Sequence, residues 1–249
     1  MLVDINYRNN SSKIKASASV FFVDEKFNIS SLKRIITSAE YSYISDLLKI
    51  SDKQKKICTF KFNSKNTTIL VSIKKNIKNF EVENLGANFY EYIKNQKQTK
   101  YILNTDTLHN EFTNLIGYFL HGIKLKSYKF EKYKNKKNNK NISIYPIGKN
   151  LPNKKEQIKF KSLEEGTFFA RDLVSEPGNI LHPDEYAKRL NLLKKNGLKI
   201  NIYDEKKLKK LGMNSLLGVG QGSIRGSYLV TIEWKGKKDN SKPLAFVGK

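Results

Sequence analysis

Three closely spaced glycines form the pattern in this chain that comes nearest to a phosphate-binding loop: Gly218, Gly220 and Gly222. In a dinucleotide-binding unit such glycines directly follow a strand and open a helix, so that the backbone can approach a pyrophosphate. Here they follow a helical stretch and lead towards a strand-like run, residues 228–234. This context favours tight backbone turns over a cofactor site. We therefore assign no cofactor-binding residue.

The chain has three histidines and one cysteine, none in a pattern typical of catalysis. His109 and His121 lack the i, i+4 spacing with an intervening Glu that a zinc-binding helix shows. His182 precedes Pro183, where it would be a weak helix cap, and we do not interpret it as a ligand. Cys58 lies in an apolar strand-like run and is interpreted as a buried hydrophobic residue. No catalytic residue is therefore assigned. A single cysteine fits a reducing compartment, so a cytoplasmic protein is expected.

The charge balance suggests a polyanionic partner, although it does not require one. Lys and Arg number 47 against 23 Asp and Glu, a formal net charge of +24. Such a charge attracts nucleic acid or anionic membranes without specificity. The alternative is compositional bias, because Lys, Asn and Ile are abundant throughout and the positive charge is spread along the chain. The bias is favoured. No membrane association is expected either, because no apolar run approaches the roughly 20 residues that span a bilayer.

A lysine-rich run, residues 132–141, divides the chain into two halves. It has no apolar periodicity, which is typical of a linker or an exposed loop. The aromatic residues Tyr128, Phe130 and Tyr133 alternate with lysines here, and such aromatics can also stack on nucleic-acid bases. The linker interpretation is favoured over the stacking one.

The first half alternates strand-like and helical patterns, as an α/β domain does. Strands are predicted over residues 18–23, 57–62, 68–73 and 142–147. One helix is predicted between Glu81 and Gln96, and a second has the apolar face Leu108, Phe112, Leu115, Ile116, Phe119 and Leu120. The aromatic residues on these faces are interpreted as core.

The second half begins with a predicted helix–turn–helix. Ser162 and Glu165 have capping-box spacing, and a helix with Leu163, Phe169, Ala170, Leu173 and Val174 on one face should end at residues 176–179. A second helix should run from Pro183 to Asn196. Beyond it, residues 198–203 form a predicted strand, Asp204 caps a short helix ending at Gly212, and residues 228–234 and 244–247 are further strands. Strand, helix and strand in succession predict a βαβ unit and a largely parallel sheet.

Several strings in this half occur together in one known family. ARDLVSEPGNILHPDEYA, LKINIYDEKKLKKLGMNSLLGVGQGS, YLVTIEWKG and PLAFVGK, with YKFEKYKNKKN and SVFFVDEKFNISSLKR upstream, succeed one another in order. This succession resembles the leucine (cytosol) aminopeptidases, the M17 metallopeptidases. The resemblance implies an N-terminal α/β, macro-like domain, followed by the incomplete start of an α/β catalytic domain with a mixed sheet. The corresponding boundaries are residues 1–130, a connecting segment 131–160, and 161–249 for the start of the catalytic domain.

The resemblance also implies a chemistry. In that family the lysine of the VGK motif is a metal ligand, and Lys249 matches it. The family holds two divalent ions, manganese or zinc, whose bridging water attacks the peptide carbonyl. Peptide substrates and a homo-hexamer are implied as partners. The carboxylate ligands of the family lie beyond the VGK string, so the chain is expected to be a fragment that is inactive by itself. The alternative function is a non-catalytic protein that binds nucleic acid through its N-terminal half.

Overall fold

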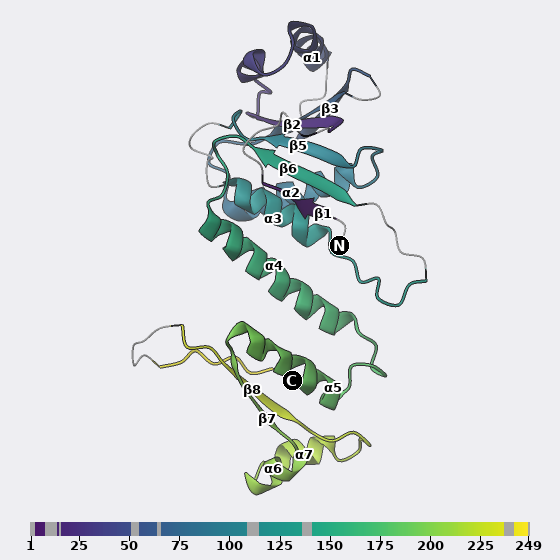
Figure 1. The fold of residues 1–249 in the computed structure, drawn as a ribbon, viewed down its shortest axis with the longest axis vertical. Helices are drawn as coiled ribbons and strands as arrows, with labels where there is room; N and C mark the ends of the chain where they lie inside the picture. Colours follow the sequence, from purple (N-terminus) through teal and green to yellow (C-terminus); the bar gives the residue numbers. More distant parts are fainter. Residues whose placement is uncertain are drawn as a thin grey trace. The chain divides into compact units, whose positions relative to one another are not determined.

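The computed structural model describes residues 3–7, 14, 16–50, 55–63, 66–108, 115–135, 141–236 and 242–248. The chain divides into two compact units, Met1–Ala170 and Arg171–Lys249. Both units combine helices with strands, and parallel and antiparallel strand pairs are both present (Figure 1). The expected α/β class with a mixed sheet is therefore confirmed.

Unit 1 is built on a six-stranded sheet of order β1-β6-β5-β2-β4-β3. All neighbouring pairs are parallel except β3 and β4, which are antiparallel. The strands are β1 (Val3–Ile5), β2 (Ala18–Val23), β3 (Ile57–Lys61), β4 (Thr67–Ser72), β5 (Lys100–Asn104) and β6 (Ile142–Ile147). The strands predicted near residues 18–23, 57–62, 68–73 and 142–147 are all confirmed.

Alternate side chains of the central strand β2 enter two different cores, as the pleat requires. Val20 and Phe22 face α2 (Asn79–Ile93) and α3 (Leu115–Lys126). Phe21 and Val23 face α1 (Ser38–Ile50) and the preceding 3-10 turn, Ser30–Arg34. Figure 1 shows α1 on one side of the sheet and α2 with α3 on the other. Covering both faces explains why β2 and β4 are almost entirely buried, as the strands of parallel sheets are.

Helices α2 and α3 approach each other through glycine. A Cβ added to Gly86 would lie 2.0 Å from the carbonyl oxygen of Phe119, and one added to Gly122 would lie 1.9 Å from that of Glu83. The helix backbones are therefore in direct contact at two points. This closeness brings Phe119 against Phe22 and Phe89, with ring centroids 5.3 and 5.5 Å apart.

Two helices of unit 1 begin at other residues than the sequence predicted. α3 begins at Leu115, and Leu108, which was expected on its face, instead lies buried in the segment after β5. Phe112 and His109 lie outside the described residues. α4 (Lys154–Ser175) begins eight residues before Ser162. Its start is capped by two reciprocal hydrogen bonds. Glu156 N–H donates to Asn153 Oδ1, and Asn153 N–H donates to Glu156 Oε2, each at 3.0 Å.

The buried face of α4 also differs from the predicted one. Phe160 and Glu164 are the buried side chains of this helix, whereas Leu163 and Val174 are exposed. Residues 136–140 of the lysine-rich run lie outside the described residues. The strand that follows them, β6, pairs with β1 and β5, so unit 1 continues past the run and ends within α4.

Unit 2 contains a two-stranded sheet of β7 (Lys199–Tyr203) and β8 (Leu229–Glu233) with short helices. The helices are α5 (Pro183–Asn191), α6 (Glu205–Lys210) and α7 (Asn214–Gly220), and α5 continues as a 3-10 turn, Leu192–Asn196. The predicted helix from Pro183 to Asn196 is confirmed, and it ends at Gly197, which takes the left-handed conformation (φ 82°). The cap at Asp204 is also confirmed, because its side chain accepts a hydrogen bond from Lys207 N–H.

The predicted parallel βαβ unit is wrong, because β7 and β8 pair antiparallel, with Tyr203 opposite Leu229. A parallel pair needs a crossover that returns to the start of the first strand. The connection contains two short helices, α6 and α7, of six and seven residues. Each spans only about 9–10 Å, whereas five strand residues span about 16 Å. The chain therefore re-enters the sheet at the end it left.

The predicted strand at residues 244–247 is not formed either. Residues 242–248 have no regular structure, and Leu244, Phe246 and Val247 are 82%, 89% and 98% exposed. A strand needs a hydrogen-bonded neighbour, and none lies beside this segment among the residues described. No helix in the described ranges has the length and apolar character needed to cross a membrane.

Candidate functional site

Lys249, the one predicted metal ligand, lies outside the described residues. The structure instead describes the framework of unit 2 that leads to it, up to Gly248. This framework consists of the turn after α4, the helix α5 and the β7–β8 pair.

The turn after α4 is fixed by one arginine. Arg189 Nη1 donates to Glu176 Oε1 at 2.8 Å, and Arg189 Nε donates to Glu185 Oε1 at 3.0 Å. The Glu176 side chain is 1% exposed, so its charge is compensated within the protein. These hydrogen bonds raise the pKa of the Arg189 guanidinium. Residues 176–179 therefore end α4, as predicted, and Arg189 ties this turn to α5.

Replacing Glu176 with Gln should loosen this connection. The amide keeps the size of the side chain but cannot balance the Arg189 charge, so we expect unit 2 to lose about 1.5–3 kcal/mol of stability. Urea denaturation followed by the fluorescence of Trp234, the single tryptophan, measures this in unit 2. Lys188→Gln, on an exposed position of the same helix, is the matched control. Equal midpoints for the two variants would show that the ion pair contributes nothing.

At the start of α5, His182 occupies the cap position without making a side-chain cap hydrogen bond. Its Nδ1 contacts the carboxylate of Asp184, which also lies 3.7 Å from Arg225 Nη1. His182 is thus a structural partner of Asp184.

The glycine cluster is placed by α7 and the turn after it. Gly218 and Gly220 lie inside α7, and Gly222 lies in the turn that follows. None of the three has a positive φ, so the prediction that they serve tight turns is wrong for Gly218 and Gly220. The approach to β8 is held by Ser227 N–H, which donates to Glu205 Oε1 at 3.1 Å. The cluster ends a helix instead of opening one, which is not the arrangement of a dinucleotide site.

The β7–β8 pair carries charges across its strands. Lys199 Nζ lies 3.2 Å from Glu233 Oε2, and Asn201 Nδ2 donates to Thr231 Oγ1 at 3.2 Å. The hydrogen bond from Lys199 lowers the pKa of the Glu233 carboxyl. This register fixes the direction in which the chain leaves β8 towards residues 242–248.

Comparison with known proteins identifies this framework. Residues 168–249 match the family model described as "Cytosol aminopeptidase family, catalytic domain". A probable cytosol aminopeptidase of Brucella anthropi is 44% identical over 137 residues, which cover 51% of this chain and 27% of that relative. A second one, of Sinorhizobium fredii, is 42% identical over 139 residues, 53% of this chain and 28% of the relative.

Residues 168–249 are thus similar to the catalytic domain of the cytosol aminopeptidases. Solved structures agree on the fold. A tomato leucine aminopeptidase mutant superposes with a TM-score of 0.73 at 17% identity, covering 92% of this chain and 50% of that one. The bottromycin maturation enzyme BotP in complex with Mn gives a TM-score of 0.65 at 15% identity, covering 88% of this chain and 45% of that one. The chain thus spans about half the length of these two solved chains, and its match covers 27–28% of the curated relatives above.

The described part of the chain does not gather metal ligands. No group of three or more His, Cys, Asp or Glu suited to a metal ion occurs among the residues described. His121 is buried in unit 1, where its Nδ1 lies 3.1 Å from Glu164 Oε1. Cys58 is half-buried on β3, with Cys58 Sγ 4.0 Å from the Lys55 carbonyl oxygen. The described side chains therefore do not fit a pair of divalent ions by themselves.

The basic, aromatic segment before residue 136 packs in part against α4. Tyr128 stacks against Phe168 of α4, with centroids 5.3 Å apart, and Phe130 packs on Tyr133 at 5.8 Å. Lys132 Nζ lies over the Tyr133 ring. Rings that contact one another are less available to bases. Neither this geometry nor the comparisons support the nucleic-acid alternative.

Proposed function

We propose that this chain belongs to an aminopeptidase that releases N-terminal amino acids from peptides. The observation that carries the proposal is the catalytic-domain match over residues 168–249. The relatives found for more than half of the chain have the same name, which supports one function over that stretch. The fold likeness of unit 1 and unit 2 to leucine aminopeptidase is consistent with it.

We further propose that the activity needs two divalent metal ions, manganese or zinc, with Lys249 as one ligand. Two dications need several anionic donors, and the described side chains do not gather them. The remaining ligands would therefore come from residues outside the described ranges. Because the chain spans a fraction of its relatives, we expect these 249 residues to be inactive alone.

Assembly and location complete the proposal. The leucine aminopeptidase resemblance suggests a homo-hexamer, in which unit 1 would assist assembly, and a cytoplasmic protein. The name cytosol aminopeptidase given to the relatives supports the location. Size-exclusion chromatography with light scattering on a chain extended past Lys249 tests the assembly directly.

The activity is tested with two proteins, the 249-residue chain and a version whose reading frame is extended past Lys249. We expect the extended protein to hydrolyse leucine p-nitroanilide when manganese or zinc is added, and the short chain to show no metal-dependent hydrolysis. A Lys249→Met variant of the extended protein should lose activity and bind less metal by equilibrium dialysis. A folded, metal-loaded extended protein without activity would overturn the proposed function.

A further inference from the structure

Unit 1 contains a cleft that the proposed peptidase chemistry does not use. It lies between the edge strand β1, the helix α3 and the first part of α4, and its volume is about 630 Å³. Sites for small molecules commonly have volumes of about 300–1,000 Å³. Its walls combine apolar side chains, including Phe160 and Leu120, with charged groups of both signs. This combination is suited to a small ligand that carries both charges and an apolar side chain.

The buried positive group of the cleft is Lys124 on α3, and the exposed Lys154 and Lys161 of α4 also line it. Lys124 is 8% exposed, and its Nζ donates one hydrogen bond, to the carbonyl oxygen of Val3 at 2.5 Å. It makes no ion pair with any carboxylate of the described residues. Two of its three N–H donors therefore have no protein acceptor in that part of the chain. Burial lowers the pKa of the Lys124 ammonium, which the carboxylates of Glu164 and Asp4 oppose.

A buried ammonium without a contacting carboxylate is costly, because it has lost water without gaining a counterion. A ligand carboxylate would supply that counterion and accept the unused hydrogen bonds. The Lys124 side chain would then be held at both of its polar contacts, by Val3 and by the ligand. We regard these unused hydrogen-bond donors of Lys124 as the strongest indication of a ligand in unit 1.

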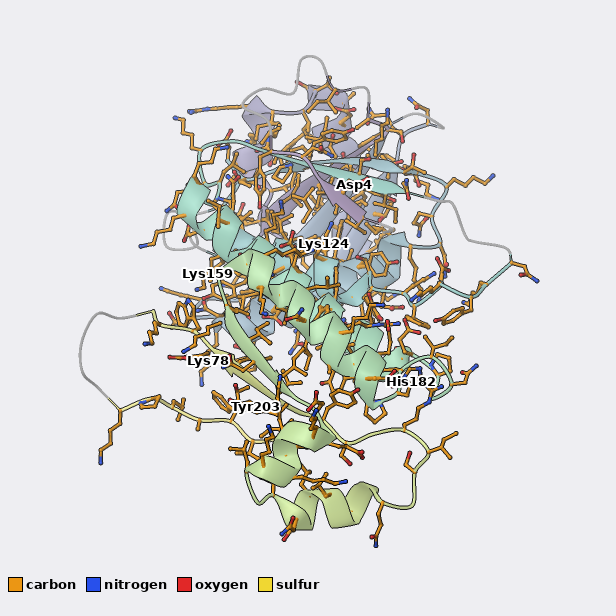
Figure 2. The ribbon with its side chains drawn as sticks, turned by 60° about the horizontal axis from the view of Figure 1, so that its bottom comes forward. Asp4, Lys78, Lys124, Lys159, His182 and Tyr203 are labelled. Carbon is orange, nitrogen blue, oxygen red and sulfur yellow. The ribbon has the colours of Figure 1, made fainter. Side chains whose placement is uncertain are left out.

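Glu164 on α4 and Asp4 on β1 are the less exposed negative groups of the cleft, which Glu165 also lines. Glu164 is 9% exposed and uses one oxygen, Oε1, to contact His121. Its other oxygen remains to accept from a ligand ammonium. Burial, with the nearby carboxylates of Glu164 and Glu156, raises the pKa of the Tyr7 hydroxyl to about 12, so this group is a neutral hydrogen-bonding partner at physiological pH. Figure 2 labels Asp4 and Lys124, which come from β1 and α3 of the same unit.

We propose that this cleft binds a free α-amino acid with an apolar side chain, Lys124 holding its carboxylate and Glu164 with Asp4 its ammonium. Phe160 and Leu120 would contact the side chain of the ligand. The choice of leucine as the probe rests on the proposed function, because an aminopeptidase of this kind releases such amino acids. The site would let the product of the reaction bind in unit 1.

The test is isothermal titration of the full 249-residue chain with L-leucine, without added metal. Leucinamide, which lacks the carboxylate, and 4-methylpentanoate, which lacks the ammonium, serve as matched probes. Lys124→Met should weaken leucine binding by about tenfold to a hundredfold, the contribution of a charge-assisted hydrogen bond. Lys126→Met, an exposed position on the same helix that does not line the cleft, should leave binding unchanged.

A second readout locates the ligand. With three histidines in the chain, the ring signals of His121 can be followed by nitrogen-15 NMR, and they should shift on adding leucine. No leucine binding at tens of millimolar, equal leucine binding by Lys124→Met and the parent chain, or binding of either analogue as tight as that of leucine would each overturn the proposal. The comparison of probes on the unchanged chain remains decisive even if Lys124→Met fails to fold. Because this test needs no activity, leucine binding without peptidase activity in the extended protein would reject the proposed function alone.

Discussion

Gly122→Ala is expected to destabilise unit 1 severely, by at least about 3 kcal/mol. The new methyl group would lie 1.9 Å from the carbonyl oxygen of Glu83, a backbone atom that cannot rotate away. Helices α2 and α3 must then separate, and the contacts of Phe119 with Phe22 and Phe89 weaken with them. Domains of this kind have total stabilities of about 5–15 kcal/mol, so the loss is a large share of the total. Urea unfolding followed by circular dichroism measures it.

Gly166→Ala is the control for this prediction. Gly166 is also inside a helix, α4, but a Cβ added there would have no atom within 4 Å. Alanine in an open helix position is favoured over glycine by about 0.5–1 kcal/mol, so this variant should be slightly more stable than the parent. If both variants shifted the midpoint in the same direction, helix propensity and not backbone contact would control both sites.

The sheet of unit 1 could be predicted where strands are buried on both faces. β2 and β4 are rich in β-branched and aromatic residues, and such runs are typical of buried strands. β1 was not predicted from the sequence, because three residues give no periodicity to detect. Its place at the edge beside β6 depends on contacts between residues 3–5 and 142–144, which are distant in the sequence.

At the start of α4, the sequence predicted the right kind of helix cap at the wrong residue. Asn153 with Glu156 and Ser162 with Glu165 have the same spacing, and both satisfy the capping-box pattern. The structure uses the first pair, since starting there brings Phe160 and Glu164 of α4 onto α3. Tertiary packing thus decides between two equivalent caps.

The predicted parallel pairing of β7 with β8 was wrong for a related reason. The order of strand and helix was correct, but the direction of the second strand depends on whether the helix is long enough to return. The strand expected at residues 244–247 has the right composition, but composition does not provide a hydrogen-bonded neighbour.

The two sites differ in how far the sequence could reveal them. Lys249 was assigned through resemblance to a family, and the family match ending at that residue agrees with the segment but does not test the role of the side chain. The cleft of unit 1 had no sequence signal, because Asp4, Lys124 and Glu164 are far apart in the chain. His121 was not expected to belong to a zinc-binding helix, and nothing near it in the sequence indicated Glu164 as its partner.

Phe160→Ala is expected to release the first part of α4 from α3, at a cost of about 3–5 kcal/mol. Phe160 is 7% exposed, and its ring meets Tyr118 and His121 at centroid distances of 5.1 and 5.2 Å. It fills the space above Gly117, where an added Cβ would lie 2.3 Å from the Phe160 ring. Without this ring the helix loses its main apolar contact with unit 1, and an undocked helix is only marginally stable in water.

Limited trypsin digestion gives the measurement, because α4 carries several lysines, among them Lys159 and Lys161. In the parent chain, cleavage at these lysines requires the docked helix to open, so it should be slow. In Phe160→Ala it should become much faster, whereas Leu163→Ala, at a position that is 49% exposed on the same helix, should be cleaved at the parent rate. Phe160→Leu should restore much of the protection, since it keeps apolar volume over Gly117. Parent-like protection in Phe160→Ala would mean that the remaining contacts, His121 with Glu164 and Tyr128 with Phe168, are sufficient to hold α4 in place.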